Sequence, residues 1–221
     1  HLGTGNYNEE TARQYTDLGL LTKDQVLGEE CRMYFRMLTH ADQPFDFKEM
    51  MVAPDNLKKR ILGLIQGEIN VQKHGGRGHV IAKMNALGDS EIIDALYNAS
   101  REGVKVDLIV RGTCCLRPGI QGVSENITVR SIVDRYLEHS RIYYFRAGGE
   151  GKLFLSSADW RSRNFHRRFE TAFPVKDPSI KKYIHDVILK CSLSDNVKAS
   201  ILQSDGSYVR AQRRTGEKAV R

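Results

Sequence analysis

The sequence of 221 residues has little of what marks membrane, metal-binding or secreted proteins. No apolar run approaches the roughly 18 residues that a membrane helix needs, and the first residues do not read as a signal peptide. Cysteines number only four, and no CxxC or Cys/His spacing is present. We therefore predict reduced thiols in a cytoplasmic protein, and no metal site.

Negatively charged residues are fewer than positively charged ones: the sequence has 27 Asp and Glu and 34 Lys and Arg, which gives a net charge of +7. This excess favours an anionic partner, whether nucleic acid, a membrane surface or a phosphorylated substrate. No motif of interleaved aromatic and basic residues is present, which argues against nucleic acid.

Hydrophobic periodicity predicts an α/β fold with a mixed sheet flanked by helices. The expected strands are residues 16–21, 47–53, 79–87, 104–110, 127–133, 141–145 and 152–155, and the expected helices are 24–38, 54–73, 90–102 and 177–191. Residues 43–45 are typical of a linker, and the chain turns polar and basic after Leu202. The sequence therefore divides into residues 1–46, a domain over 47–202, and a tail over 203–221 that we expect to be mobile.

Two segments of the chain match without gaps at a constant offset of 153 residues (157 − 4). The matched pairs are Thr4 and Ser157, Asn6 and Asp159, Tyr15 and Arg168, Asp17 and Glu170, and Asp24 and Asp177. Hydroxyl matches hydroxyl and carboxylate matches carboxylate, and each copy continues into a short apolar strand and an Asp-capped helix. The pattern predicts a duplicated unit.

A histidine precedes the second copy, in the order His139, Ser140, Arg141 before an apolar strand. Histidine can attack phosphorus to form a phosphoramidate, and a second histidine can exchange the proton of the leaving or attacking oxygen. Flanking cations and hydroxyls neutralise the phosphoryl oxygens. Two half-sites need two histidines, and the position equivalent to His139 in the first copy falls before residue 1. We therefore expect the nucleophile of the first half upstream of this sequence.

The order of these residues resembles the phospholipase D superfamily, whose half-site reads His-x-Lys, then Gly-Ser-x-Asn, then a later Asn and Glu. The positions that match are Arg141 for the lysine, Ser157 for the serine, Asp159 for the first Asn, Arg168 for the second and Glu170 for the Glu. The resemblance implies a phospholipase-D-like fold. The phosphodiesterases of that superfamily use amides where this chain has Asp159 and Arg168, so we expect a different reaction.

Longer strings resemble the large bacterial type of polyphosphate kinase, over most of the chain to about Ala199. They are residues 1–8, 11–17, 103–106, 110–112, 131–139 and 155–160. The resemblance implies reversible transfer of the terminal phosphate of ATP to inorganic polyphosphate, through a phosphohistidine and with Mg²⁺. In that family the phosphorylated histidine lies in a His-x-Lys strand, which no residue here matches. The magnesium-associated arginines also have no match, so the ion is expected without a ligand in this sequence.

Residue roles follow from the same resemblance. Tyr15, Arg111 and His139 would bind ATP and phosphate, with Arg168 as a further phosphate contact and His139 as the catalytic second histidine. The expected supporting residues are Asn6, Asp17, Arg141, Ser157, Asp159 and Glu170. Arg111 follows an apolar strand, where α/β folds place ligands. We expect Arg111, His139, Ser157 and Arg168 to converge on one pocket.

The family also sets expectations for organisation and partners. Residues 1–46 would be the end of a first phospholipase-D-like domain, incomplete by itself, and 47–202 a second one. ATP or ADP and polyphosphate are the expected partners, with a homo-oligomer in the full-length protein and a location in the cytoplasm or at the inner membrane face. This chain alone should be inactive. Two alternatives stay open: a phospholipase-D-type phosphodiesterase, or a non-catalytic module that binds polyanions.

Overall fold

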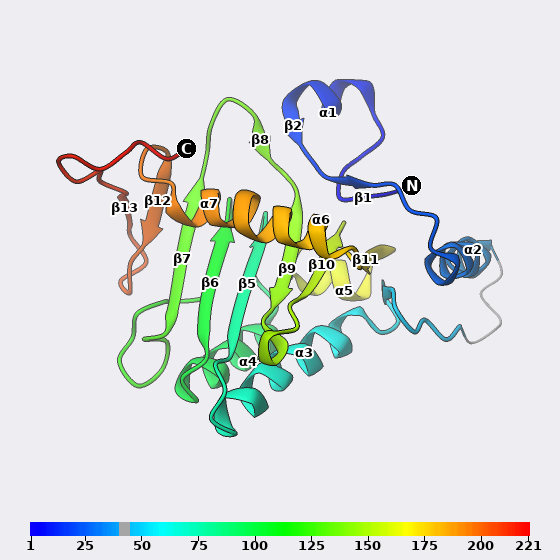
Figure 1. Cartoon of the computed structure of the whole chain (residues 1–221), viewed down its shortest axis with the longest axis horizontal. Coiled ribbons are helices and arrows are strands. Elements are labelled where there is room, and N and C mark those ends of the chain that lie inside the picture. The colour runs from blue at the N-terminus through cyan, green and yellow to red at the C-terminus, as the bar shows by residue number, and fades with distance from the viewer. Residues whose placement is uncertain (40–44) are drawn as a thin grey trace.

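The computed structural model describes residues 1–39 and 45–221, and its centre is a nine-stranded mixed sheet (Figure 1). The strand order is β13-β12-β7-β6-β5-β9-β10-β11-β4. Strands β5, β6 and β7 run parallel, and the other neighbours run antiparallel. The expected α/β fold, a mixed sheet flanked by helices, is confirmed.

The bounds of the elements are as follows. The sheet contains β4 (Met51–Ala53), β5 (His79–Met84), β6 (Lys105–Val110), β7 (Ile127–Ile132), β9 (Arg141–Phe145), β10 (Lys152–Ser156), β11 (Glu170–Pro174), β12 (Ala199–Leu202) and β13 (Tyr208–Arg210). Outside it, β1 (Leu2–Gly3) pairs with β3 (Gly19–Leu20), and β2 (Tyr15–Thr16) pairs with β8 (Leu137–Glu138). The helices are α1 (Glu9–Gln14), α2 (Gln25–Thr39), α3 (Leu57–Lys73), α4 (Ser90–Arg101), η1 (Ala147–Gly149), α5 (Ser162–His166), α6 (Pro178–Tyr183), the π-helical η2 (Ile184–Leu189) and α7 (Lys190–Ser194).

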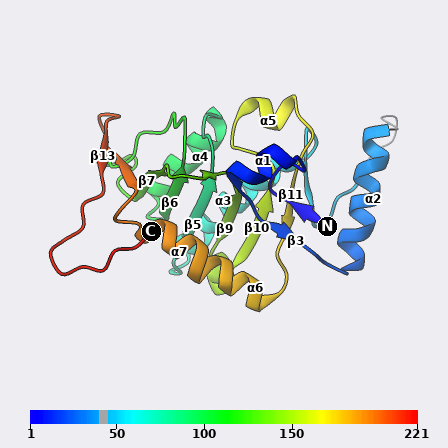
Figure 2. The ribbon, with the colours of Figure 1, turned by 90° about the horizontal axis from the view of Figure 1, so that it is seen from above.

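Alternate residues of the central strands enter two hydrophobic layers. On β5, Val80 and Ala82 pack in the layer of α3 and α4, whereas Ile81 packs in the layer of η2. Figure 2 shows α4 on one side of the sheet and the continuous helix α6-η2-α7 on the other. A parallel sheet that is covered on both faces needs apolar strands, which explains the nearly continuous apolar runs of β5 and β6. None of the helices in the described part of the chain is long and apolar enough to cross a membrane.

The duplicated unit is confirmed by its strand pairs and helices. Leu2 pairs with Leu20 in the first copy, and Leu155 pairs with Phe173 in the second, at the same offset of 153 residues. A short helix lies between the paired strands of each copy, α1 in the first and α5 in the second. Each copy ends in a helix, and Asp24 and Asp177 accept the backbone N–H three residues onward, both at 3.0 Å.

Residues 1–39 pack against the rest of the chain. β2 runs parallel to β8, and α2 contributes Leu27 to the hydrophobic layer that holds Phe47 and Met50. Within residues 1–39 the only sheet is the two-stranded pair β1–β3. This segment therefore has no broad sheet of its own to cover α2. That residues 1–46 end a first domain stays a prediction.

Two expected strands differ from the structure, and part of the expected linker cannot be compared with it. The strand expected over 16–21 is two short strands, β2 and β3, that pair with different partners. The strand expected over 47–53 begins only at Met51, because the buried carboxylate of Glu30 accepts the backbone N–H groups of Lys48, Glu49 and Met50. Residues 43 and 44 of the expected linker lie outside the described residues.

The chain after Leu202 corrects the expectation of a separate tail. β12 turns at Gly206 and returns as β13, so Leu202 pairs with Tyr208 inside a β-hairpin at the sheet edge. Further on, the backbone N–H of Val220 donates to Asn196 at 2.9 Å. The sheet therefore continues past the expected boundary at residue 202. Mobility of the remaining residues stays a prediction.

Candidate functional site

The backbone of His139 is fixed by the N-terminal segment. His139 follows β8, which pairs with β2, and the N–H groups of His139 and Ser140 donate to the carbonyl of Thr16 at 3.1 and 3.0 Å. The histidine therefore belongs to the second copy of the repeat but rests on the first. It lies near the carboxyl ends of β5 and β6, where open α/β sheets bind ligands.

The imidazole of His139 is held by a carboxylate, a cation and an aromatic ring. Nδ1 lies 2.9 Å from Asp17 Oδ2, and Nε2 lies 2.9 Å from an Nη1 of Arg141. The ring of Tyr15 packs on the imidazole with 4.8 Å between the ring centroids. A carboxylate at Nδ1 selects the tautomer that is protonated there and leaves Nε2 as the basic nitrogen. Arg141 fits this tautomer, because Nε2 then accepts its hydrogen bond.

Asp17 is held as a carboxylate that accepts the ring N–H of His139. Thr4 Oγ1 donates to Asp17 Oδ1 at 2.7 Å, and the N–H of Leu18 donates to Thr4 Oγ1 at 3.0 Å. Burial alone would raise the pKa of Asp17, but the hydrogen bonds from His139 and Thr4 outweigh it and hold the pKa below its ordinary value. Asp17 is therefore a carboxylate at neutral pH and stabilises His139 when the ring is protonated.

Asn85 connects the other groups of the site. Its Oδ1 accepts from Arg111 Nε at 2.9 Å, and its Nδ2 donates to the carbonyl of His139 at 3.2 Å. Its backbone N–H donates to Asp159 Oδ1 at 2.8 Å, and the same oxygen accepts from Arg141 Nε at 3.1 Å. One asparagine at the end of β5 thus positions a cation, the histidine segment and a buried ion pair.

Lys83 of strand β5 anchors the segment that carries His139. Its side chain is 2% exposed, and Nζ donates to Ser140 Oγ at 2.9 Å and lies 3.2 Å from Glu138 Oε2. Burial lowers the pKa of Lys83, and the Glu138 carboxylate opposes that shift. A buried ammonium between these two residues ties both neighbours of His139 to the central strand β5.

These groups face a cavity of about 350 Å³ at the strand ends. Five arginines line it, Arg111, Arg141, Arg161, Arg163 and Arg168, together with Tyr15, Asn85, His139 and Asp159. A neighbouring cavity of about 510 Å³ shares Tyr15 and Arg111 and adds Arg13 and Arg135. Several convergent guanidinium groups bind phosphate oxygens well, since each offers a planar fork of N–H donors.

The donor set of this cavity does not fit a resident metal ion. Within residues 1–39 and 45–221, no group of three or more His, Cys, Asp or Glu side chains could hold one. The arginines around the cavity would also repel a divalent cation.

The expected site residues divide into three groups. Arg111, His139 and Arg168 line one cavity as expected, and Tyr15, Arg141 and Asp159 line it too. Asp17 lies behind the histidine. The other three residues lie elsewhere: Asn6, Ser157 and Glu170 do not line this cavity.

The expectation that Ser157 converges on one pocket with Arg111, His139 and Arg168 is wrong. Its Oγ donates to Glu170 Oε2 at 2.5 Å and accepts from the N–H of Thr171 at 3.1 Å. The Ser157 hydroxyl therefore donates and accepts hydrogen bonds within the second copy, where it supports Glu170. Asn6 has no side-chain hydrogen-bond partner among the described residues and lines a smaller cavity beside Asp17.

Glu170 forms the counterpart of Asp17 in the second copy. Besides Ser157, it accepts from Asn164 Nδ2 at 2.6 Å and lies 3.8 Å from Arg168 Nη1. Thr4 with Asp17 and Leu18 has the same hydrogen bonds as Ser157 with Glu170 and Thr171. The molecule therefore contains two equivalent carboxylate positions, of which one holds a histidine.

Sequence reasoning missed Asn85, Lys83, Arg161 and Arg163. Asn85 follows a buried parallel strand, and the strand-end rule that pointed to Arg111 would have found it. Lys83 carries no such signal, because a lysine inside an apolar strand is ordinarily expected at the surface. Arg161 and Arg163 start a helix that the periodicity did not predict.

The duplicated carboxylate positions and the cavity lined by five arginines are features of an α/β fold that suit phosphate groups. The family model "Polyphosphate kinase C-terminal domain 2" matches residues 50–221, and "Polyphosphate kinase C-terminal domain 1" matches residues 1–44. The chain belongs to the polyphosphate kinase family.

Individual relatives agree with this assignment. A polyphosphate kinase from Rhodopirellula baltica is 50% identical over 221 residues, which is 100% of this chain and 26% of the relative. One from Exiguobacterium is 50% identical over 220 residues, 100% of this chain and 30% of the relative. The crystal structure of polyphosphate kinase from Porphyromonas gingivalis matches with a TM-score of 0.94 and 44% identity, over 100% of this chain and 34% of that one. This chain thus spans about a third or less of the length of these relatives.

A phospholipase D family member, Nuc from Salmonella typhimurium, is far more distant. It matches 62% of this chain with a TM-score of 0.44 and 13% identity.

Proposed function

We propose that this chain is the part of an ATP:polyphosphate phosphotransferase that binds nucleotide and phosphate and supplies one of two histidines. The observation that carries the proposal is the carboxylate-held imidazole of His139 inside the cavity lined by Arg111 and Arg168. Family membership supports the same activity, whereas the phosphodiesterase and the non-catalytic module have no support of their own.

The reaction has two steps that exchange bonds at one phosphorus atom. In the first, the bond from the terminal phosphorus of ATP to its bridging oxygen breaks, an N–P bond forms on a histidine, and ADP leaves. In the second, a terminal oxygen of polyphosphate attacks that phosphorus and the N–P bond breaks. The phosphorylated histidine belongs, by family resemblance, to a His-x-Lys strand, and this sequence has no such motif.

His139 takes the role of acid and base in these steps. With Nδ1–H donated to Asp17, Nε2 can accept a proton from the attacking oxygen or return one to the leaving oxygen, once Arg141 turns its N–H from Nε2 to the phosphate. Arg111 and Arg168 neutralise the phosphoryl oxygens, and Tyr15 packs beside the ring to limit its rotation. Each of these roles needs a group that is held in place before the substrate arrives, which the contacts of Asp17 and Asn85 provide.

Glu170 supplies the second half-site. Because its hydrogen bonds repeat those of Asp17, we infer that it holds the ring N–H of the phosphorylated histidine when the two half-sites are complete. Arg168 occupies the place that Tyr15 occupies in the first copy, and would lie beside that histidine as a phosphate ligand.

Other features of the whole protein follow from the family and stay predictions. Magnesium would accompany the ATP phosphates, but no step assigned here to this chain runs through the ion. A homo-oligomer and a location in the cytoplasm, or at the inner membrane face, are expected on the same ground.

Binding and activity of the 221-residue chain test the proposal. The chain should bind ATP and polyphosphate with affinities that fall steeply as salt rises from about 50 to 200 mM, since phosphate contacts release counterions. It should form no polymer from ATP. Titration calorimetry at the two salt concentrations, with Arg111→Ala as the comparison, measures the first part. An affinity that changes neither with salt nor in Arg111→Ala would refute the proposal, and so would polymer growth by this chain.

A further inference from the structure

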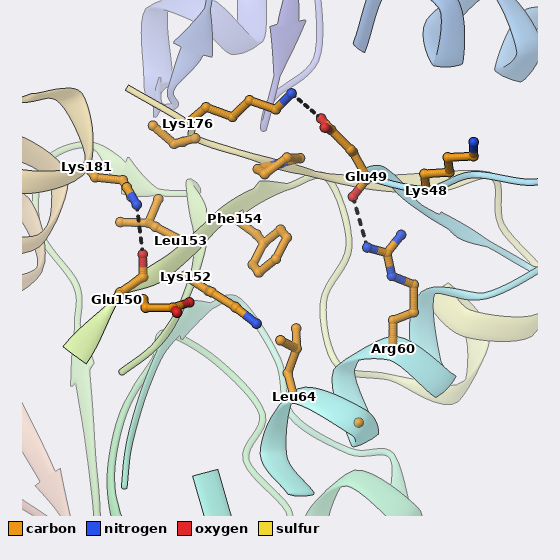
Figure 3. Close-up of a pocket in the computed structure, with 14 residues that line it drawn as sticks. Lys48, Glu49, Arg60, Leu64, Glu150, Lys152, Leu153, Phe154, Lys176 and Lys181 are labelled. Atoms are coloured by element: carbon orange, nitrogen blue, oxygen red, sulfur yellow. Dashed lines mark hydrogen bonds and ion pairs between the residues drawn. The ribbon is translucent and has the colours of Figure 1, made fainter. Parts of the chain in front are cut away.

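A second cavity, of about 600 Å³, lies at the opposite end of β10 from the His139 site (Figure 3). Lys152 begins β10 and lines this cavity, whereas Ser156 ends the strand and leads to Asp159 in the other one. The two cavities share no lining residue. A ligand here would therefore bind independently of the histidine.

Positive charge dominates the wall of this cavity. Its five cations are Lys48, Arg60, Lys152, Lys176 and Lys181, and its carboxylates are Glu49 and Glu150. The cations come from separate parts of the fold, namely the segment before β4, helix α3, strand β10, the segment between β11 and α6, and helix α6. Such convergence from distant segments favours an anionic ligand.

Not all of these cations are free to bind. Arg60 uses its guanidinium on the backbone carbonyls of Phe47, Glu49 and Met50. Lys176 pairs with Asp24 and Glu49, at 2.8 and 2.5 Å. Lys181 donates one of its three N–H groups to the carbonyl of Gly151 at 3.0 Å, which leaves two for a ligand. Within the described residues, Lys48 and Lys152 have no ion-pair or hydrogen-bond partner for their ammonium groups, and Figure 3 shows Lys152 extending into the cavity.

The remainder of the wall is apolar. Phe154 lies at its centre beside Leu64, and Leu153, Val175 and Pro174 complete it. An inorganic phosphate chain has no group that would gain from this surface, whereas a flat aromatic group would. The volume is in the range of about 300–1,000 Å³ that small-molecule sites occupy.

An extended peptide is a poor alternative, although the cavity borders an open strand edge. β4 pairs with β11 only as far as Met51 opposite Ala172. The N–H of Val175 donates inward to Leu153, so Pro174 is the next residue that faces outward. Proline has no N–H to offer an added strand, and therefore blocks the edge.

We propose that this cavity binds a nucleoside polyphosphate, with the base against Phe154 and Leu64 and the phosphates on Lys48, Lys152 and Lys181. Lysine ammonium groups bind phosphate as point charges, whereas a carboxylate ligand would favour a guanidinium fork, and the fork of Arg60 is already used. The site goes beyond the proposed transferase function, which uses only the cavity of His139.

Methyl NMR of the 221-residue chain tests the site without an activity assay. The other cavity is first weakened by Arg111→Ala with Arg168→Ala. ATP, added without a metal ion, should then still shift the methyl signals of Leu64 and Val175 in a saturable way. Tripolyphosphate should bind there at least about tenfold more weakly, because it cannot use the apolar wall.

A charge-reversal pair locates the phosphates. Lys48→Glu with Lys152→Glu should weaken ATP binding at this site by at least about tenfold, the loss expected for charge-assisted hydrogen bonds. The matched control is Lys59→Glu with Lys190→Glu, two exposed lysines that line neither cavity, and it should change the affinity less than about threefold, by screened long-range charge alone.

Three results would overturn the proposal. They are unshifted methyl signals at millimolar ATP, tripolyphosphate binding as tight as ATP, and equal losses in the control pair and the Lys48 and Lys152 pair. The ligand comparison uses unaltered residues in this cavity, so it decides the matter even if a charge-reversed chain fails to fold.

Discussion

The two copies of the repeated unit differ in what their carboxylates hold. Asp17 of the first copy holds the imidazole of His139, which precedes the second copy. Glu170 of the second copy holds Ser157 and Asn164 instead, with Arg168 at 3.8 Å. The hydroxyl support of the two carboxylates is the same in both copies. The half-site around His139 is therefore assembled across the copies, and neither copy contains a complete one.

The aromatic and cationic positions differ between the copies as well. Tyr15 packs on the His139 ring, whereas its counterpart Arg168 has a side chain that is 55% exposed and faces the cavity. A tyrosine limits the rotation of the ring without adding charge, and an arginine adds charge where phosphate would arrive. Few substitutions thus give the two copies of one scaffold different side chains around equivalent carboxylates.

The largest expected effect comes from Asp17→Asn. The amide keeps the shape of the side chain but can donate to Nδ1 and so select the wrong tautomer of His139. In a polypeptide that also carries the upstream family sequence, we expect polyphosphate synthesis to fall by roughly 1,000-fold or more, as for other carboxylate-to-amide changes behind a catalytic histidine. Steady-state rates measure the loss.

Glu170→Gln is the matched variant in the other copy, and the two half-sites should be comparably sensitive. A loss below about tenfold for Asp17→Asn would mean that the carboxylate only supports the fold, since a positioned acid or base contributes about 100-fold or more.

The second-largest expected effect is the loss of folding stability in Lys83→Met. The change leaves Glu138 and Ser140 without their buried donor, and breaking such a pair costs about 3 kcal/mol. Urea denaturation of this chain measures the free energy of unfolding. Lys105→Met is the control, because its side chain is 64% exposed in an ion pair with Asp107, and such pairs contribute less than about 1 kcal/mol. Equal losses in the two variants would show that Lys83 does not anchor the His139 segment.

Much of this comparison could be predicted from sequence. The offset of 153 residues located both carboxylates, both hydroxyls and both helix caps, because a duplicated unit repeats its hydrogen bonds along with its residues. The offset did not reveal that Ser157 serves Glu170. From sequence, a serine near a histidine motif reads as a ligand donor, and only the strand pairing of β10 with β11 places the hydroxyl beside its own carboxylate.

The missed elements share a physical cause. All three residues of β13, Tyr208, Val209 and Arg210, are exposed, so no alternation of buried and exposed side chains marks a strand there. The strand expected from residue 47 begins only at Met51, because Glu30 takes the backbone N–H groups of Lys48, Glu49 and Met50. Long-range contacts such as these are not encoded in local periodicity.

ATP affinity should fall when an arginine of the His139 cavity is removed, but not when an arginine outside it is removed. Arg111→Ala is expected to weaken ATP binding by about 10- to 30-fold, the loss of one charge-assisted contact with phosphate. The change also frees Asn85 from its contact with the guanidinium. Calorimetric titration of this chain measures the affinity, and Arg101→Ala, an exposed arginine outside the cavity, is the control. Unchanged affinity in Arg111→Ala would remove this residue from the site.

The smallest expected effect is on the pH dependence of stability. Because the folded chain holds the pKa of Asp17 below its ordinary value, this group adds stability above the unfolded-state pKa of about 3.9, and the contribution is lost as pH falls through the lower folded pKa. The difference in unfolding free energy between the unsubstituted chain and Asp17→Asn should therefore be larger at pH 6 than at about pH 2. Urea midpoints at both pH values check this, and a difference that grows towards low pH would contradict the assignment.

Phosphate labelling tests most directly whether His139 is the acid and base and not the nucleophile. The 221-residue chain and a longer polypeptide with the upstream family sequence are incubated with γ-labelled ATP and magnesium, and the acid-labile label is mapped to a residue. We expect no label on this chain, and label on the longer polypeptide at a histidine other than His139 that survives His139→Ala at least in part. Acid-labile label on His139 itself would contradict the assignment of the two half-sites.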